Sequence, residues 1–182
     1  MMITKVHALS QGFSGVRLEV VERIIYFIEN DLAPIVPEQG SVGASGDLAP
    51  LSHLFLPLFG EGEFWIGNDI KPAKEVLAQH NLDPIELSAK EGLGLINGTQ
   101  FILSHAIAGL KKMEYLLDLA DVAGAMSLEG FQGSASPFKE ALHKIRPFQG
   151  NLKVAERMRM LLNGSENLHS HSNEQCPRVQ DP

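Results

Sequence analysis

The residues best suited to chemistry lie in a glycine-rich stretch, residues 37–53, which reads PEQGSVGASGDLAPLSH. Its three glycines allow positive φ angles and sharp bends without steric cost. Asp47 is predicted to be the N-cap of a helix that begins at Leu48 and tolerates Pro50 in its first turn. Free N–H groups and the helix dipole favour an anion at that end. The loop therefore suits a reaction in which negative charge develops.

The triplet Ala44-Ser45-Gly46 at the centre of this stretch points to one reaction in particular. In a forced bend, the backbone nitrogen of Gly46 can close a five-membered ring on the carbonyl of Ala44. Loss of one water from the ring and one from Ser45 would then leave a methylidene group on a conjugated imidazolone. That group is a strong electrophile made from the protein chain alone. The competing interpretation is an ordinary glycine-rich connection.

The longer run 40–51, GSVGASGDLAPL, closely resembles the signature of the aromatic amino acid ammonia-lyases. The resemblance implies that the triplet Ala44-Ser45-Gly46 forms the family's prosthetic group, 4-methylidene-imidazole-5-one (MIO). It also implies a catalytic role for these three residues. The residues expected to bind the group are Gly43, Asp47, Leu48 and Asn97.

A second segment, residues 92–100 with the sequence GLGLINGTQ, resembles the family's Asn-Gly-Thr segment. The side-chain amide of Asn97 supplies both a donor and an acceptor. The resemblance implies that Asn97 is catalytic and contacts the imidazolone or positions the substrate amine. Without the resemblance, Asn97-Gly98 is better interpreted as a turn before a helix cap at Thr99.

A third segment, residues 176–182 with the sequence CPRVQDP, resembles the start of a further lyase motif. In the family this motif continues with a tyrosine and then an arginine that binds the substrate carboxylate. Gln180 is the catalytic-site member of the motif that this sequence contains; on other grounds it is a surface glutamine. Because family members are much longer and carry their catalytic tyrosine upstream, the chain is expected to be an internal fragment with little or no activity alone.

The resemblance implies an ammonia-lyase that removes ammonia from a small-molecule amino acid to give an α,β-unsaturated acid. The ending VQDP favours L-histidine as the substrate and trans-urocanate as the product. A phenylalanine or tyrosine ammonia-lyase and an aminomutase of the same family are alternatives. A further alternative is a non-catalytic folded fragment in which Ala44-Ser45-Gly46 stays uncyclised. The family's homotetramers imply a homo-oligomer.

Composition excludes several other classes of function. The net charge is -7 and the basic residues form no long run, so no nucleic-acid partner is expected. No apolar run approaches the roughly 20 residues of a membrane span. The single cysteine, Cys176, cannot form an internal disulfide. With no signal-peptide pattern at the start, these features predict a cytoplasmic protein without a membrane partner.

Neither a metal nor a nucleotide is expected as a cofactor. His169 and His171 lie near Glu174 and Cys176, but their spacing fits no closed tetrahedral metal site. The glycine-rich loop lacks the Lys-Ser/Thr ending of a phosphate-binding loop.

The elements around these motifs are predicted to be mainly helical. An amphipathic helix begins after a cap at Ser14 and ends before Pro34, and a small hairpin lies near residues 60–70. From Thr99 an apolar pattern continues for over twenty residues and predicts a long helix, buried on most sides as in a bundle or an oligomer interface. Two further helices are expected, one capped by Ser136 and one by Asn151.

The expected architecture is therefore a mainly α fold. With the resemblance, it becomes a long-helix bundle of the ammonia-lyase (fumarase/aspartase-like) type. Residues 1–164 are expected to form the helical core segment that carries the Ala-Ser-Gly loop. The polar residues 165–182 are expected to form an active-site loop or a frayed end.

Overall fold

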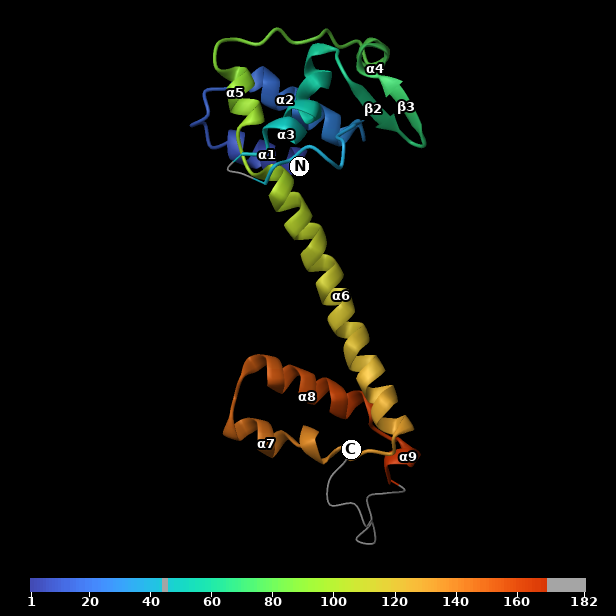
Figure 1. Ribbon diagram of the computed structural model, residues 1–182. Coiled ribbons are helices and arrows are strands. Elements are labelled where there is room, and N and C mark those ends of the chain that lie inside the picture. Colours follow the sequence, from blue (N-terminus) through green and yellow to red (C-terminus); the bar gives the residue numbers. More distant parts are fainter. Residues whose placement is uncertain (44–45, 170–182) are drawn as a thin grey trace. The chain divides into compact units, whose positions relative to one another are not determined.

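The computed structural model describes residues 1–43 and 46–169. Two compact units divide the chain: an N-terminal unit, Met1–Gly109, and a C-terminal unit, Leu110–Pro182. Helices dominate both units, which confirms the predicted mainly α class (Figure 1). The boundary predicted near residue 164 stays a prediction.

Helices form most of the N-terminal unit. They are α1 (Met2–Leu9), α2 (Leu18–Glu29), α3 (Leu48–Phe55), the 3₁₀ helix η1 (Leu56–Phe59), α4 (Ala73–Gln79) and α5 (Glu91–Ile96). The apolar face of α2 supplies Val20, Ile24 and Phe27 to the core, and Phe27 packs edge-on against Phe64 with ring centroids 5.0 Å apart. Burial of this face gives α2 a stability that a helix of 12 residues lacks alone.

The predicted start of α2 is wrong by several residues, since Arg17, and not Ser14, occupies the N-cap position. The cause is a tertiary contact with α5. A Cβ added to Gly94 would lie only 2.7 Å from Val16 Cγ2 and 3.5 Å from the carbonyl oxygen of Ser14. Residues 14–16 therefore lie flat against α5 at a glycine, and the helix begins only after them.

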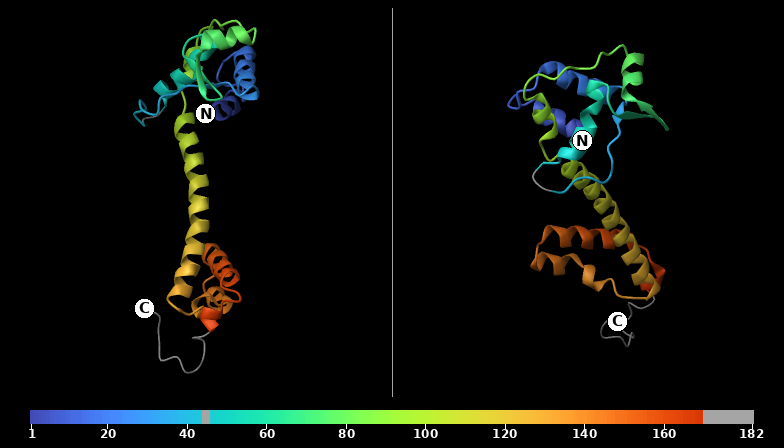
Figure 2. Two further views of the ribbon diagram at one scale, coloured as in Figure 1. Left: turned by 90° about the vertical axis from the view of Figure 1, so that its right-hand side faces the viewer. Right: turned by 45° about the horizontal axis from the view of Figure 1, so that its top comes forward.

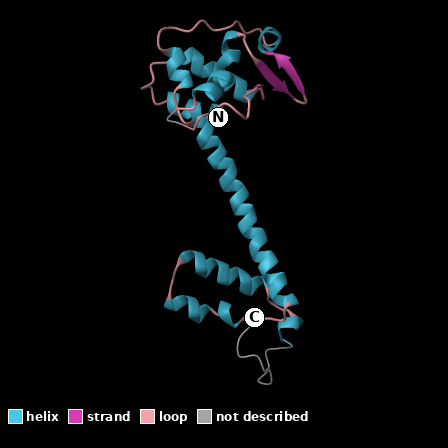
Figure 3. Cartoon of the chain, in the orientation of Figure 1, coloured by secondary structure: helices cyan, strands magenta, loops and turns pink. Residues whose placement is uncertain are grey.

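The predicted hairpin is confirmed. Strand β2 (Glu63–Ile66) pairs with β3 (Asp69–Pro72) in antiparallel register, with Trp65 opposite Ile70. Sequence reasoning missed a third strand, β1 (Ala33–Pro34), which pairs with the other edge of β2. The sheet order is β1-β2-β3, and Figure 3 shows the β2–β3 hairpin among the helices of this unit.

The predicted long helix is confirmed as α6 (Gln100–Gly130), with 31 residues. It begins in the N-terminal unit and ends in the C-terminal unit (Figure 1). Within the described chain this helix is not buried in a bundle, because Ala125 alone of its residues is buried. Burial at an oligomer interface, the other predicted setting, stays a prediction. Its large apolar side chains are exposed, among them Ile107, Leu110, Leu116, Leu117 and Met126.

Segment 91–130 is long and apolar enough to cross a membrane by length and composition, which corrects the expectation that no stretch approaches that limit. The core helix of a soluble bundle meets the same criteria, so this property alone is weak evidence for a membrane span.

The C-terminal unit contains η2 (Ser136–Phe138), α7 (Glu140–Ile145), α8 (Gln149–Leu161) and α9 (Glu166–His169) (Figure 2). Its small core combines Ala125 of α6 with Met158, Leu162 and Leu168. Two predicted boundaries are wrong here. The helix expected after Ser136 is interrupted at Lys139, and α8 starts before Asn151, with Phe148 at its N-cap position.

Candidate active site

The glycine-rich loop has the backbone bends that its sequence predicts. Gly40, Gly43 and Gly46 have φ angles of 128°, 64° and 101°, a region that side chains rarely adopt. Within the loop, the backbone N–H of Gly43 donates to Ser41 Oγ at 3.2 Å. The predicted catalytic residues Ala44 and Ser45 lie outside the described residues, as does Gln180.

Asp47 follows the triplet and is 1% exposed. It occupies the predicted N-cap position of α3, but its side chain does not cap that helix. Instead, Oδ1 accepts a hydrogen bond from Ser41 Oγ and Oδ2 accepts one from the backbone N–H of Ile102, both at 3.1 Å. Because Ile102 lies in the first turn of α6, the carboxylate caps the long helix and ties it to the loop.

Gly46 and Asn97 lie side by side, although they are far apart in the sequence. A Cβ added to Gly46 would lie 3.1 Å from Asn97 Oδ1, 3.9 Å from the Gly98 nitrogen and 3.9 Å from Leu48 Cδ2. The backbone N–H of Asp47 also donates to the carbonyl of Gly98 at 2.7 Å. The structure thus brings the last residue of the triplet against the predicted Asn97 amide.

The other predicted binding residues differ in their surroundings. Leu48 is half exposed beside Gly46. Gly43 is exposed, and a Cβ added to it would meet no atom within 4 Å in the described part of the chain. The roles of Gly43, Leu48 and Asp47 toward a prosthetic group stay predictions.

Lys5 of α1 reaches the same place, and sequence reasoning missed it. Its Nζ donates to the backbone carbonyl of Asn97 at 2.8 Å, and the residue is 2% exposed. Burial lowers the pKa of this amine to about 8. The signal available in the sequence was a lysine at helical spacing between apolar residues, but no helix was predicted before the cap at Ser14.

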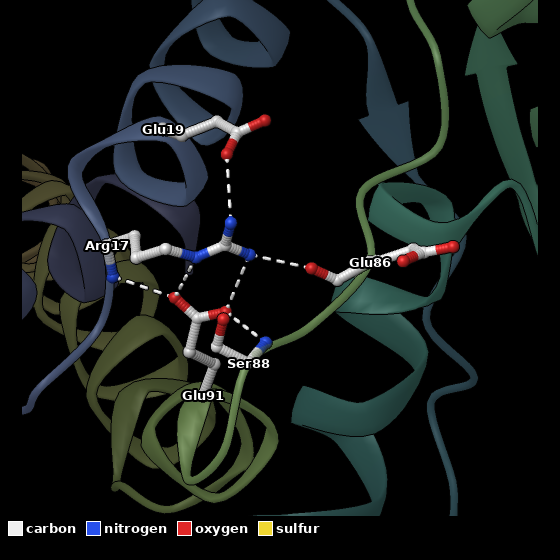
Figure 4. Close-up of polar contacts among 5 residues, drawn as sticks. All are labelled: Arg17, Glu19, Glu86, Ser88 and Glu91. Atoms are coloured by element: carbon white, nitrogen blue, oxygen red, sulfur yellow. Dashed lines mark hydrogen bonds and ion pairs between the residues drawn. The ribbon is translucent and has the colours of Figure 1, made fainter.

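An ion pair anchors α5, the helix that ends just before Asn97 (Figure 4). The Glu91 carboxylate is 1% exposed and accepts hydrogen bonds from the backbone N–H, Nε and Nη2 of Arg17, at 2.8, 3.0 and 3.0 Å. It also accepts the backbone N–H of Ser88 at 2.7 Å, just before the start of α5. Hydrogen bonds from Arg17, above all, lower the pKa of Glu91 to about 2.

Three separate stretches therefore converge on one point: the loop end at 46–47, the turn at 97–98, and α1. The arrangement presents a side-chain amide and the N-terminus of α3 beside a tightly bent backbone, which can stabilise developing negative charge. Among residues 1–43 and 46–169, no group of three His, Cys, Asp or Glu side chains is placed to hold a metal ion.

The sequence model of a family described as aromatic amino acid lyase matches residues 1–182, the whole chain. The chain belongs to the aromatic amino acid lyase family. Among curated relatives of this lyase family, the histidine ammonia-lyase of Sorangium cellulosum is 47% identical over 181 residues, and that of Shewanella woodyi is 50% identical over 182. Each match covers all of this chain. The chain spans only 35% and 36% of the length of those two proteins.

Solved structures of the lyase family have the same fold. Histidine ammonia-lyase from Trypanosoma cruzi matches with a TM-score of 0.78 and 41% identity, over 87% of this chain and 31% of that one. Phenylalanine ammonia-lyase from the yeast Rhodosporidium toruloides matches with a TM-score of 0.89 and 35% identity, over 100% of this chain and 29% of that one.

The described residues of this lyase segment fit a ring made from the triplet. Gly46 has a φ that disfavours a side chain, and a Cβ there would press on the Asn97 oxygen. Position 46 therefore favours glycine over residues with a side chain, and its backbone nitrogen lies in a bent segment. The Asn97 amide lies beside this position, and its role toward a ring stays a prediction. Asp47 fixes the backbone that follows, through its hydrogen bonds to Ile102 and Gly98.

Proposed function

We propose that this chain is the MIO-forming segment of a histidine ammonia-lyase, which eliminates ammonia from L-histidine to give trans-urocanate. The curated relatives quoted above are histidine ammonia-lyases that match the chain along its whole length. The chain spans only 35% and 36% of the length of those relatives. The proposed activity is therefore that of the whole enzyme, of which this chain is one segment.

The proximity of the Asn97 side chain to Gly46 carries this proposal. Ring closure at the triplet needs a bent backbone without a side chain at its third residue, and Gly46 meets both conditions. An amide beside this residue can bind the product of the cyclisation and, later, the substrate amine. The family's chemistry and the local geometry therefore indicate the same pair of residues.

MIO supplies an electrophile that turns the substrate's amino group into a better leaving group. The chain's own residues would orient the prosthetic group and hold the loop that forms it. Asn97 aims its amide at the loop, while Asp47 fixes the backbone after the triplet and caps α6 with the same side chain. The N-terminus of α3 lies directly after the loop and favours negative charge there.

The first test is the intact mass of the purified chain. Ring closure and the dehydration of Ser45 each remove one water, so a mass lower by about 36 Da is expected. The matched control is Ser45→Ala, which cannot form the methylidene group. A wild-type mass equal to that of the linear sequence would contradict cyclisation in this chain, and would support the alternative of an uncyclised, non-catalytic fragment.

Substrate choice needs the longer protein that contains this segment. Release of urocanate from L-histidine is expected, with little product from phenylalanine or tyrosine. The solved phenylalanine ammonia-lyase matches the fold with a TM-score of 0.89, so the fold does not separate these substrates. A cinnamate product, or a β-amino acid, would instead identify a phenylalanine lyase or an aminomutase.

The proposal includes assembly with further copies of the chain, as the family's homotetramers imply. Exposed leucine, isoleucine and methionine side chains along α6 supply an apolar surface of the kind that helices bury at oligomer interfaces. Sedimentation of the longer protein should give a tetramer. A monomer at micromolar concentration would contradict this part of the proposal.

A further inference from the structure

The contacts around Asn97 show a buried cation for which the proposed mechanism has no use. We propose that Lys5 is a positioning residue, which holds the Asn97-Gly98 turn against the end of the loop at Gly46 and Asp47. This inference rests on the proposed function for its catalytic meaning. The physical claim, that Lys5 fixes the turn and through it the loop, stands on the contacts alone.

Three contacts link Lys5 to the glycine-rich loop through the Asn97-Gly98 turn. Lys5 Nζ donates to the carbonyl of Asn97 at 2.8 Å. The next carbonyl, that of Gly98, accepts the backbone N–H of Asp47 at 2.7 Å. The Asn97 side chain meanwhile lies against Gly46. The dipeptide Asn97-Gly98 is therefore hydrogen-bonded both to Lys5 of α1 and to Asp47 at the end of the loop. A movement of this turn would displace the loop directly.

The chemistry of Lys5 supports a specific role over simple packing. Lysine is seldom fully buried unless its charge is paired. In the described part of the chain, no carboxylate forms an ion pair with Lys5, and its one side-chain hydrogen bond goes to Asn97. An apolar residue would fill the same space at lower cost. A charged donor, however, binds a carbonyl about twice as strongly as a neutral one.

The position of the carbonyl explains why it needs a donor from outside its helix. Asn97 is the residue after α5, with extended backbone angles of φ -88° and ψ 119°. Carbonyls at a helix end lack partners in their own helix and are often bound by a lysine or arginine. A pure capping role would stabilise α5 alone. A positioning role predicts in addition an effect at the Asp47 amide, in the glycine-rich loop.

Hydrogen exchange at the Asp47 amide separates these two roles. The variant is Lys5→Met, which keeps an unbranched apolar stem and removes the charge. We expect exchange at the Asp47 amide to become faster by roughly tenfold, as for loss of a charged hydrogen bond. The Ile35 amide, which donates to Glu63 at 2.9 Å in the sheet region, should keep its wild-type rate.

Two further variants complete the design. Lys5→Arg keeps a buried cationic donor and should restore most of the protection at Asp47. Lys74→Met makes the same substitution at an exposed lysine of α4 and should change neither amide. An unchanged Asp47 rate in Lys5→Met would overturn the proposal. Equal acceleration at Asp47 and Ile35 would also overturn it, because that pattern means general loss of stability.

The intact mass of each variant is measured in parallel. If the wild-type chain loses two waters, Lys5→Met should cyclise to a smaller extent than Lys5→Arg. If the wild-type chain stays linear, cyclisation in this chain is contradicted, yet the exchange rates still decide the role of Lys5. Failure of the proposed function and failure of this inference are thus distinguishable.

Discussion

Replacing Glu91 by glutamine should destabilise the N-terminal unit, because the carboxylate is the centre of a hydrogen-bond network that joins α5 to residue 17. The carboxylate is buried and accepts three hydrogen bonds from Arg17 and one from Ser88 (Figure 4). Glutamine has nearly the same shape but turns two N–H bonds toward these donors. The substitution therefore removes acceptors without creating a cavity.

The size of the effect follows from which charge is left behind. Loss of one partner from a buried ion pair costs roughly 3–5 kcal/mol when the other charge stays buried. Here the side chain of Arg17 is 43% exposed, so water can solvate the remaining guanidinium. We therefore expect a loss at or below the lower end of that range, about 2–3 kcal/mol of unfolding free energy.

Urea denaturation followed by tryptophan fluorescence measures this loss. Trp65 is the single tryptophan and lies on β2, inside the N-terminal unit. The matched control is Glu19→Gln, because Glu19 contacts the same guanidinium at 3.2 Å but is exposed. The control should cost less than about 0.5 kcal/mol. Equal losses in the two variants would refute the argument from burial.

The pH dependence gives a second check with a definite sign. Arg17 lowers the pKa of Glu91 from its ordinary value of 4.5 to about 2. The resulting stabilisation is therefore complete above pH 4.5 and is lost as the pH falls through 2. The difference between wild type and Glu91→Gln should be largest at neutral pH and shrink in acid. A difference that grows toward pH 2 would contradict the assignment.

Three further substitutions test other contacts. Asp47→Asn should cost about 1 kcal/mol and speed exchange at the Ile102 amide, since the α6 cap is weakened; an unchanged Ile102 rate would contradict the cap. Gly46→Ala should abolish the loss of two waters and destabilise the loop by about 1–2 kcal/mol, because its φ is 101°; a dehydrated variant would refute this. Arg157→Gln removes ion pairs with Asp118 and Asp121, so melting followed by circular dichroism should show a lower midpoint for the C-terminal unit, without a change in tryptophan fluorescence.

Periodicity and turn chemistry predicted the elements whose structure depends on nearby residues. The apolar spacing of α2 is local, and so is the turn signal at residues 67–69 that closes the hairpin. The length of α6 also follows from its own pattern. Strand β1 could not be predicted in this way. It has two residues and exists because β2, thirty positions later, offers an unpaired edge.

The candidate site could be predicted only in part, because some of its contacts join residues far apart in the sequence. The motif resemblance selected Gly46 and Asn97, and the structure places them next to each other. The partners of Asp47 were misjudged, because a helix-start pattern assigns an acidic residue to the helix that follows it. The structure instead gives this carboxylate to α6, more than fifty residues later. Lys5 was missed because a short helix with a charged residue inward looks irregular by periodicity.

Asp47, which caps α6, links the glycine-rich loop to this long apolar helix, two features that lie far apart in the sequence. Asp47 ends the glycine-rich loop and is hydrogen-bonded both to the first turn of α6 and to the Asn97-Gly98 turn. The large apolar side chains along α6 lack cover within the described chain, while its first turn is held by the Asp47 carboxylate. In the proposed oligomer, we therefore expect a partner that packs on α6 to restrain the loop as well, through the buried Asp47 carboxylate.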